Sequence, residues 1–141
     1  MSQLQQLKQY IDEETRNRIV FTQNVIPDLS YSDVGWVIAS WLDKKNEQNF
    51  HLDSSIISKV FQSGNVNGTI GKYTALENIG ILFEPDLRLD LHNIFESNSK
   101  NQCLIITSDG IVDNNKERYY FQTNESPYTI ALSGLSFLTL Q

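Results

Sequence analysis

The chain has 141 residues, of which 40% are hydrophobic and 11% are aromatic, so it is expected to fold around a core and not to be disordered. Its formal charge is −6 and its eleven Lys and Arg residues are scattered, which argues against direct nucleic-acid binding and leaves basic protein partners open. No apolar run approaches the ~18 residues that cross a bilayer, and the polar start does not resemble a signal peptide.

The first predicted elements are a helix and a strand. Leu4, Leu7 and Ile11 share one helical face, which predicts a short N-terminal helix. A charged turn follows, and the apolar run over residues 18–23 predicts the first strand.

A second, strongly amphipathic helix is predicted to begin near Asp33. Ser30 and Asp33 form an S-x-x-D capping pattern at its start. Its buried stripe is expected to consist of Val34, Val37, Ile38, Trp41 and Leu42.

The remaining elements are predicted from apolar runs and turn residues. Pro85 is expected to stop a helical turn, and Asp90 to cap a helix that ends at Ser97. The expected elements are a strand at 49–52, a helix at 54–62, a loop at 63–71, a strand at 72–78, a helical turn within 79–87, a strand at 103–109 and an antiparallel hairpin formed by 117–123 and 128–134.

Strands that alternate with helices predict an α/β fold of three layers, with a mostly parallel sheet and helices on both of its faces. The C-terminal hairpin is expected at one edge of this sheet, which makes the sheet mixed. We expect one domain over residues 1–141. The single cysteine, Cys103, lies in an apolar run, has no disulfide partner, and suits a reducing cytoplasm.

The strand, loop and helix over residues 18–42 have the order of a nucleotide-binding unit, but the loop lacks its chemistry. Phosphate loops use glycines, free backbone N–H groups and a lysine to hold the anion. Here Pro27 has no N–H to donate, Asp28 and Asp33 would repel phosphate, and there is no lysine. We therefore expect no nucleotide cofactor.

Other catalytic or metal sites are weakly indicated. Glu77 ends an apolar strand and could be a metal-binding carboxylate, although it is more simply the point where the strand emerges. Neither Pro-Asp pair is followed by a nuclease-type E-x-K strand, and the two histidines have no partners at zinc spacing. We expect no metal site and no catalytic residue.

Trp36 lies outside the apolar stripe of its helix. It is about 140° around the helix from Trp41. Either it packs under a neighbouring element, or it is an exposed anchor for a protein partner.

Residues from Glu77 onward resemble the C-terminal half of BrxF, the small P-loop protein of type 3 BREX phage-defence systems. The matching features are Leu76-Glu77-Asn78 at a strand end, then Ile81-Leu82-Phe83, Pro85, Leu87, Leu89 and Asp90, and finally a Tyr-containing segment. The resemblance implies a P-loop-like fold in a protein that acts beside larger defence enzymes. This sequence departs from the family in its lost Walker A loop, so Glu77 and Asn78 would be vestiges of a Walker B site.

These observations lead to one main hypothesis and two alternatives. The main hypothesis is a non-catalytic accessory subunit of a BREX-like anti-phage system, which binds larger defence proteins or itself. The alternatives are an acidic immunity protein that covers a basic toxin or nuclease, and a metal-dependent enzyme that uses Glu77. The candidate interface residues are Trp36, Phe83, Glu84, Asp86 and Arg88.

Overall fold

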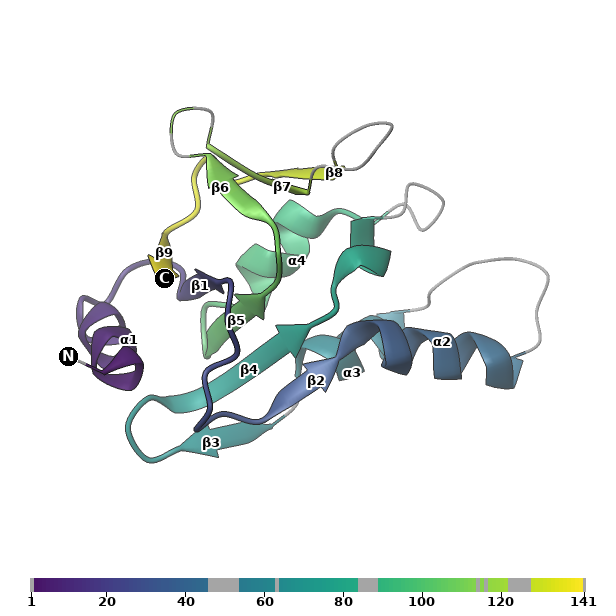
Figure 1. Ribbon diagram of the computed structural model, residues 1–141, viewed down its shortest axis with the longest axis horizontal. Helices are drawn as coiled ribbons and strands as arrows, with labels where there is room; N and C mark the ends of the chain where they lie inside the picture. The colour runs from purple at the N-terminus through teal and green to yellow at the C-terminus, as the bar shows by residue number, and fades with distance from the viewer. Residues whose placement is uncertain are drawn as a thin grey trace.

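The computed structural model describes residues 2–45, 54–62, 64–83, 89–113, 115, 117–121 and 128–140. It contains two sheets, four α-helices and one 3-10 turn in these ranges (Figure 1). The helices are α1 (Gln3–Asp12), α2 (Val34–Lys45), α3 (Ser54–Phe61) and α4 (Leu91–Ser97), and the 3-10 turn is η1 (Gly80–Phe83).

The main sheet has six strands and is mostly parallel, as the sequence predicts. Its central path runs β2 (Tyr31–Asp33), β4 (Gly71–Glu77), β5 (Cys103–Thr107), β1 (Ile19–Thr22) and β9 (Phe137–Leu140), with all four neighbouring pairs parallel. The sixth strand, β3 (Asn65–Asn67), pairs antiparallel with the first residues of β4. Because β5 occupies one edge of β4, β2 and β3 share the other edge.

Both faces of the main sheet are covered, which explains why its central strands are apolar throughout. Every residue of β1 and β5 is buried, as is typical of parallel strands between two layers. On one face the strands pack against α1 and against the loop between β1 and β2. On the other face they pack against α2, α3, η1 and α4. The predicted three-layer arrangement with helices on both faces is therefore present.

The predicted C-terminal hairpin exists, but it does not belong to the main sheet. Strands β7 (Arg118–Phe121) and β8 (Tyr128–Ala131) pair antiparallel, and β6 (Ile111–Asp113) joins them in a separate three-stranded sheet. This second sheet lies at the top of the view in Figure 1. Tyr119 and Ile130 bury its inner face against the main core. The hairpin therefore forms a small cover for the main sheet and not its edge.

Several short elements differ from the expectations. Strand β3 falls in a segment expected to be a loop, while β2, β6 and β9 were not predicted at all. The second helix follows β2 directly, and Asp33 alone caps it: the Trp36 N–H donates to Asp33 Oδ1 at 2.9 Å. The strand expected at 49–52 lies outside the described residues.

No helix in the described ranges is long and apolar enough to cross a membrane.

Candidate functional site

Backbone N–H groups of the loop after β1 form hydrogen bonds within the protein. The N–H groups of Asn24, Ile26, Leu29 and Ser30 donate, in that order, to the Thr22 hydroxyl at 3.3 Å, the Tyr31 hydroxyl at 3.1 Å, the Ile26 carbonyl at 3.1 Å and the Tyr73 hydroxyl at 2.9 Å. A phosphate loop needs such groups free and aimed at one anion. In this conformation these four N–H groups already donate to acceptors of the protein itself and do not point at a common anion site.

The path of this loop also separates β1 from the helix that was expected to follow it. Ile26 and Leu29 are buried against the face that carries α1, so the loop crosses that face. It then enters β2 at the far edge of the sheet. The expected strand–loop–helix unit is thus a strand–loop–strand–helix unit, and the N-terminus of α2 does not follow the end of β1.

A surface hollow of about 470 Å³ lies at the carboxyl ends of β1 and β9. Ligands of open α/β sheets commonly bind at carboxyl ends of strands. The hollow is lined by Phe21, Thr22, Gln23, Asn24, Gly110, Ile111, Val112, Tyr119, Thr139 and Leu140, none of which is charged. Burial raises the pKa of the Tyr119 hydroxyl, and its hydroxyl is hydrogen-bonded to Ser108. Among the described residues, the lining therefore offers no cation to an anionic ligand and no ionised base.

The second and more constrained site is the junction where β4 meets the start of α2. Asn78, directly after β4, adopts a left-handed backbone with φ of 54°. Its carbonyl accepts from the Gly35 N–H at 3.1 Å, and its side-chain Nδ2 donates to Asp33 Oδ1 at 2.8 Å. A Cβ on Gly35 would come within 2.4 Å of that Nδ2, so a larger residue would displace the Asn78 side chain from this position. Asn78 therefore ties the helix to the sheet.

Hydrogen bonds to the carboxylate lower the pKa of Asp33. The backbone N–H of Trp36 has the largest effect, followed by the side chain of Asn78. Both donors favour the charged form, which also suits the N-terminus of a helix. Asp33 and Asn78 thus hold the start of α2 to the end of β4. The vestigial Walker B role expected of Glu77 and Asn78 stays a prediction.

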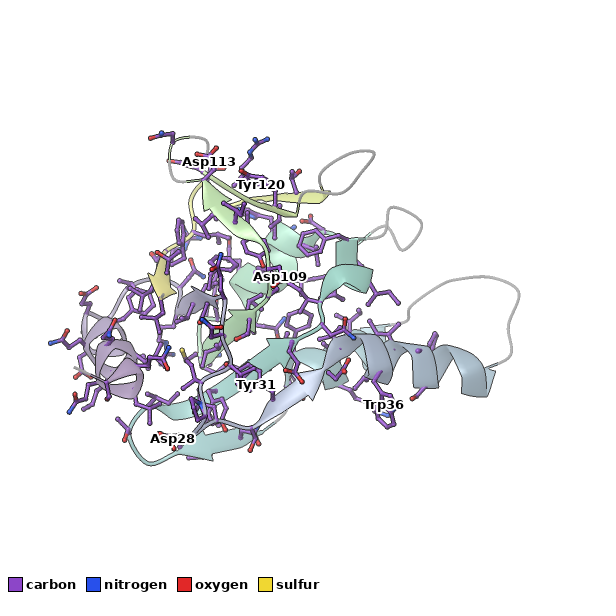
Figure 2. The ribbon with its side chains drawn as sticks, in the orientation of Figure 1. Asp28, Tyr31, Trp36, Asp109, Asp113 and Tyr120 are labelled. Atoms are coloured by element: carbon purple, nitrogen blue, oxygen red, sulfur yellow. The ribbon has the colours of Figure 1, made fainter. Side chains whose placement is uncertain are left out.

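Trp36 extends from this junction into solvent. Its exposed fraction is 69%, and Figure 2 shows the side chain pointing away from the body of the molecule. Of the two readings of Trp36, packing under a neighbouring element is therefore wrong. In the expected stripe of the same helix, Val34 and Ile38 are fully buried, whereas Trp41 is half-buried.

Of the other interface candidates, the structure describes Phe83 only. Phe83 is 8% exposed and belongs to the main core, so its assignment to an interface was wrong. It was assigned as part of the segment 83–90, which was expected to be a partner face, but η1 buries it together with Leu82. Glu84, Asp86 and Arg88 lie outside the described residues.

Glu77 lies at the end of β4 beside Asp33, its partner in the parallel register. It is half-buried, in keeping with a strand end that emerges from the sheet. No group of three His, Cys, Asp or Glu side chains that could hold a metal occurs within the described ranges. His92 instead contacts the Ser133 carbonyl at 3.0 Å through its Nε2. His51 lies outside those ranges.

A buried polar network at the amino end of the sheet was missed by the sequence analysis. Asn17 is fully buried before β1, and its carbonyl accepts from the Tyr10 hydroxyl at 2.9 Å. Its Nδ2 donates to Ser99 Oγ at 3.3 Å and to the Glu96 carbonyl at 3.4 Å. Polar residues in a charged turn gave no sequence signal of burial.

Neither family models, curated proteins nor solved structures match this chain.

Proposed function

We propose that this chain is a non-catalytic accessory subunit that acts through protein contacts, in a bacterial anti-phage system of the BREX type. The observation that carries the protein-binding role is the 69% exposed indole of Trp36 on a helix whose start is fixed to the sheet. Large exposed aromatics on rigid elements are frequent anchors of protein interfaces. The BREX-type setting rests on the resemblance to BrxF of the chain from Leu76 onward, including its Tyr-containing segment.

The same proposal includes a degenerate P-loop-like frame. It is supported by a mostly parallel sheet in which β1 is flanked on both sides, with helices on both faces. The loop after β1 argues for the loss of nucleotide binding, because Pro27 lacks an N–H and four neighbouring N–H groups are bonded internally.

Co-expression with the products of the neighbouring genes tests the proposal. We expect a stable complex with a larger defence protein on size exclusion, and Trp36→Ala should weaken it by about tenfold or more. Ile111→Ala is the matched control, since Ile111 is 42% exposed on the second sheet. This variant should leave the complex intact.

Two outcomes would contradict the proposal. Equal loss of the complex in both variants would show a general defect and not an interface at Trp36. A complex formed with an adjacent toxin or nuclease, and with no defence protein, would favour an immunity protein.

A further inference from the structure

The surface around Trp36 combines a rigid anchor, an open strand edge and a single sign of charge. We call Ser32, Asp33, Trp36 and Glu77 the Trp36 surface. The Trp36 backbone N–H is held by Asp33 Oδ1 at 2.9 Å, and Gly35 is held by the Asn78 carbonyl at 3.1 Å. Because the helix start is fixed, little backbone freedom is lost when a partner contacts the indole.

The outer edge of β2 is open next to this anchor. In the described part of the chain β2 pairs with β4 and with no other strand. Backbone groups of alternate residues face the neighbouring strand in a parallel pair. The Gly35 N–H bonds to the Asn78 carbonyl. Counting back by two residues along the chain, the backbone N–H and C=O groups of Asp33 and Tyr31 also point toward β4. The N–H and C=O of Ser32 therefore face outward, where an extended segment can pair with them.

The charges at this edge are negative. Asp33 and Glu77 are register partners on neighbouring strands, and Figure 2 shows Asp28 along the same lower border of the molecule as Trp36. No Lys or Arg lies between Arg18 and Lys44 in the sequence, and none lies between Lys72 and Arg88. Two copies docked through this edge would bring like charges together, which disfavours self-association here.

We propose that the Trp36 surface binds an extended segment of a partner protein that carries Arg or Lys side chains. This inference rests on the proposed function and specifies the chemistry of its partner. The segment's backbone bonds to Ser32, its cationic side chains lie near Asp33 and Glu77, and a guanidinium stacks on the Trp36 indole. The carboxylates select the sign of the partner's charge, and the indole supplies most of the affinity.

The test uses three fluorescein-labelled peptides of ten residues, titrated by fluorescence anisotropy. The first alternates Arg and Val, the second alternates Glu and Val, and the third is the Arg peptide with every backbone amide nitrogen methylated, so that neither of its edges can donate a backbone hydrogen bond. We expect the first peptide to bind most tightly and Trp36→Ala to weaken it by about tenfold or more. Glu77→Gln should weaken binding by about threefold and reduce its salt dependence. Ile111→Ala should have no effect.

Each of four results would overturn the inference. Unchanged binding of the Arg peptide to the Trp36→Ala variant would reveal general charge attraction without docking. Tighter binding of the Glu peptide would reverse the charge assignment, and equal binding of the methylated peptide would exclude strand pairing. A dimer that sedimentation detects in the wild type and not in Trp36→Ala would identify a second copy as the occupant.

The peptide titrations and the co-expression test can fail separately. If a defence protein binds in a Trp36-dependent way but no peptide binds, the proposed function stands and the basic-segment inference fails. If the Arg peptide binds through Trp36 but no defence protein does, the chemistry of the surface stands and the proposed function fails.

Discussion

The two ends of the main sheet use polar side chains in opposite ways. At the amino end, Asn17 and Ser99 are fully buried and bond to backbone carbonyls and to each other. At the carboxyl end, Asp33 and Asn78 make equally specific bonds, yet they lie at the surface and leave Trp36 in solvent. The comparison teaches that a polar network holds the fold at both ends, but only the second presents an accessible anchor.

The largest expected effect is at the buried end. Asn17→Asp keeps the shape of the side chain but replaces the Nδ2 donor with an acceptor beside the Glu96 carbonyl and the Ser99 hydroxyl. A buried charge without a partner costs about 3 kcal/mol or more, so the free energy of unfolding should fall by that amount near pH 7. Chemical denaturation at several pH values measures it.

The pH dependence of this variant gives an internal control. Burial raises the pKa of an introduced carboxyl, so its cost is present above the unfolded pKa of about 3.9 and shrinks as the pH is lowered toward 4. If Asn17→Asp is as stable as the wild type at pH 7, water reaches the side chain at position 17 and the amino end of the sheet is not as buried as its contacts imply.

The next effect concerns the close approach at the exposed end. Gly35→Ala would place a methyl group within 2.4 Å of Asn78 Nδ2, and we expect a loss of about 2 kcal/mol in a denaturant melt. Asn78→Gly removes that side chain and suits the left-handed backbone. The double variant should therefore lose less stability than the sum of the two single variants. Strict additivity would show that the contact does not cause the strain.

A smaller effect is expected at the cap of α2. Asp33→Ala should cost about 1 kcal/mol, because the Trp36 N–H loses its acceptor. Asp33→Asn keeps a capping oxygen and removes the charge. The wild type carries a lowered pKa at Asp33, so its charge-dependent stability is present above about pH 3.9 and is lost as the pH falls through the lower folded value. Melting temperatures of the wild type and of Asp33→Asn, measured between pH 7 and 2, should become equal only at the acid end.

The smallest effect on stability is expected at the residue with the largest proposed effect on binding. Trp36→Ala should change the free energy of unfolding by no more than about 0.5 kcal/mol, because the indole is 69% exposed. Trp41→Ala should cost more, yet less than the roughly 3–5 kcal/mol of a fully buried aromatic such as Phe95, because Trp41 is half-buried. Thermal melts of the three alanine variants give the order, and a Trp36 variant as unstable as the Phe95 variant would contradict it.

The sequence predicts the parts of the fold that local apolar patterns determine. Strands β1, β4 and β5 were found because all of β1 and β5 and the middle of β4 are buried on both faces, and α4 was found because Asp90 is a clear cap. Strands β2 and β3 were missed, since Tyr-Ser-Asp and Asn-Val-Asn have no apolar run. They form because their backbones pair with β4, which no local pattern reveals.

The same distinction, between local pattern and distant contacts, separates the site residues that could be predicted from those that could not. Trp36 could be singled out because helical geometry alone places it off the apolar stripe. Phe83 was assigned to an interface together with the whole segment 83–90, whereas packing between the helices and the second sheet buries it. The role of Asn78 could not be predicted, since it depends on a contact with Gly35 from a distant segment.

The position of β1 in the sheet has a consequence for synthesis on the ribosome. Both neighbours of β1, the strands β5 and β9, come from the last third of the chain, with Ile19 level with Leu104 on one side and Phe137 on the other. An emerging chain therefore carries an apolar strand with two unpaired edges until β5 is available, and with one unpaired edge until β9 follows. Distant pairings of this kind slow folding and expose aggregation-prone edges, so the nascent chain should depend on chaperone protection until β9 is released.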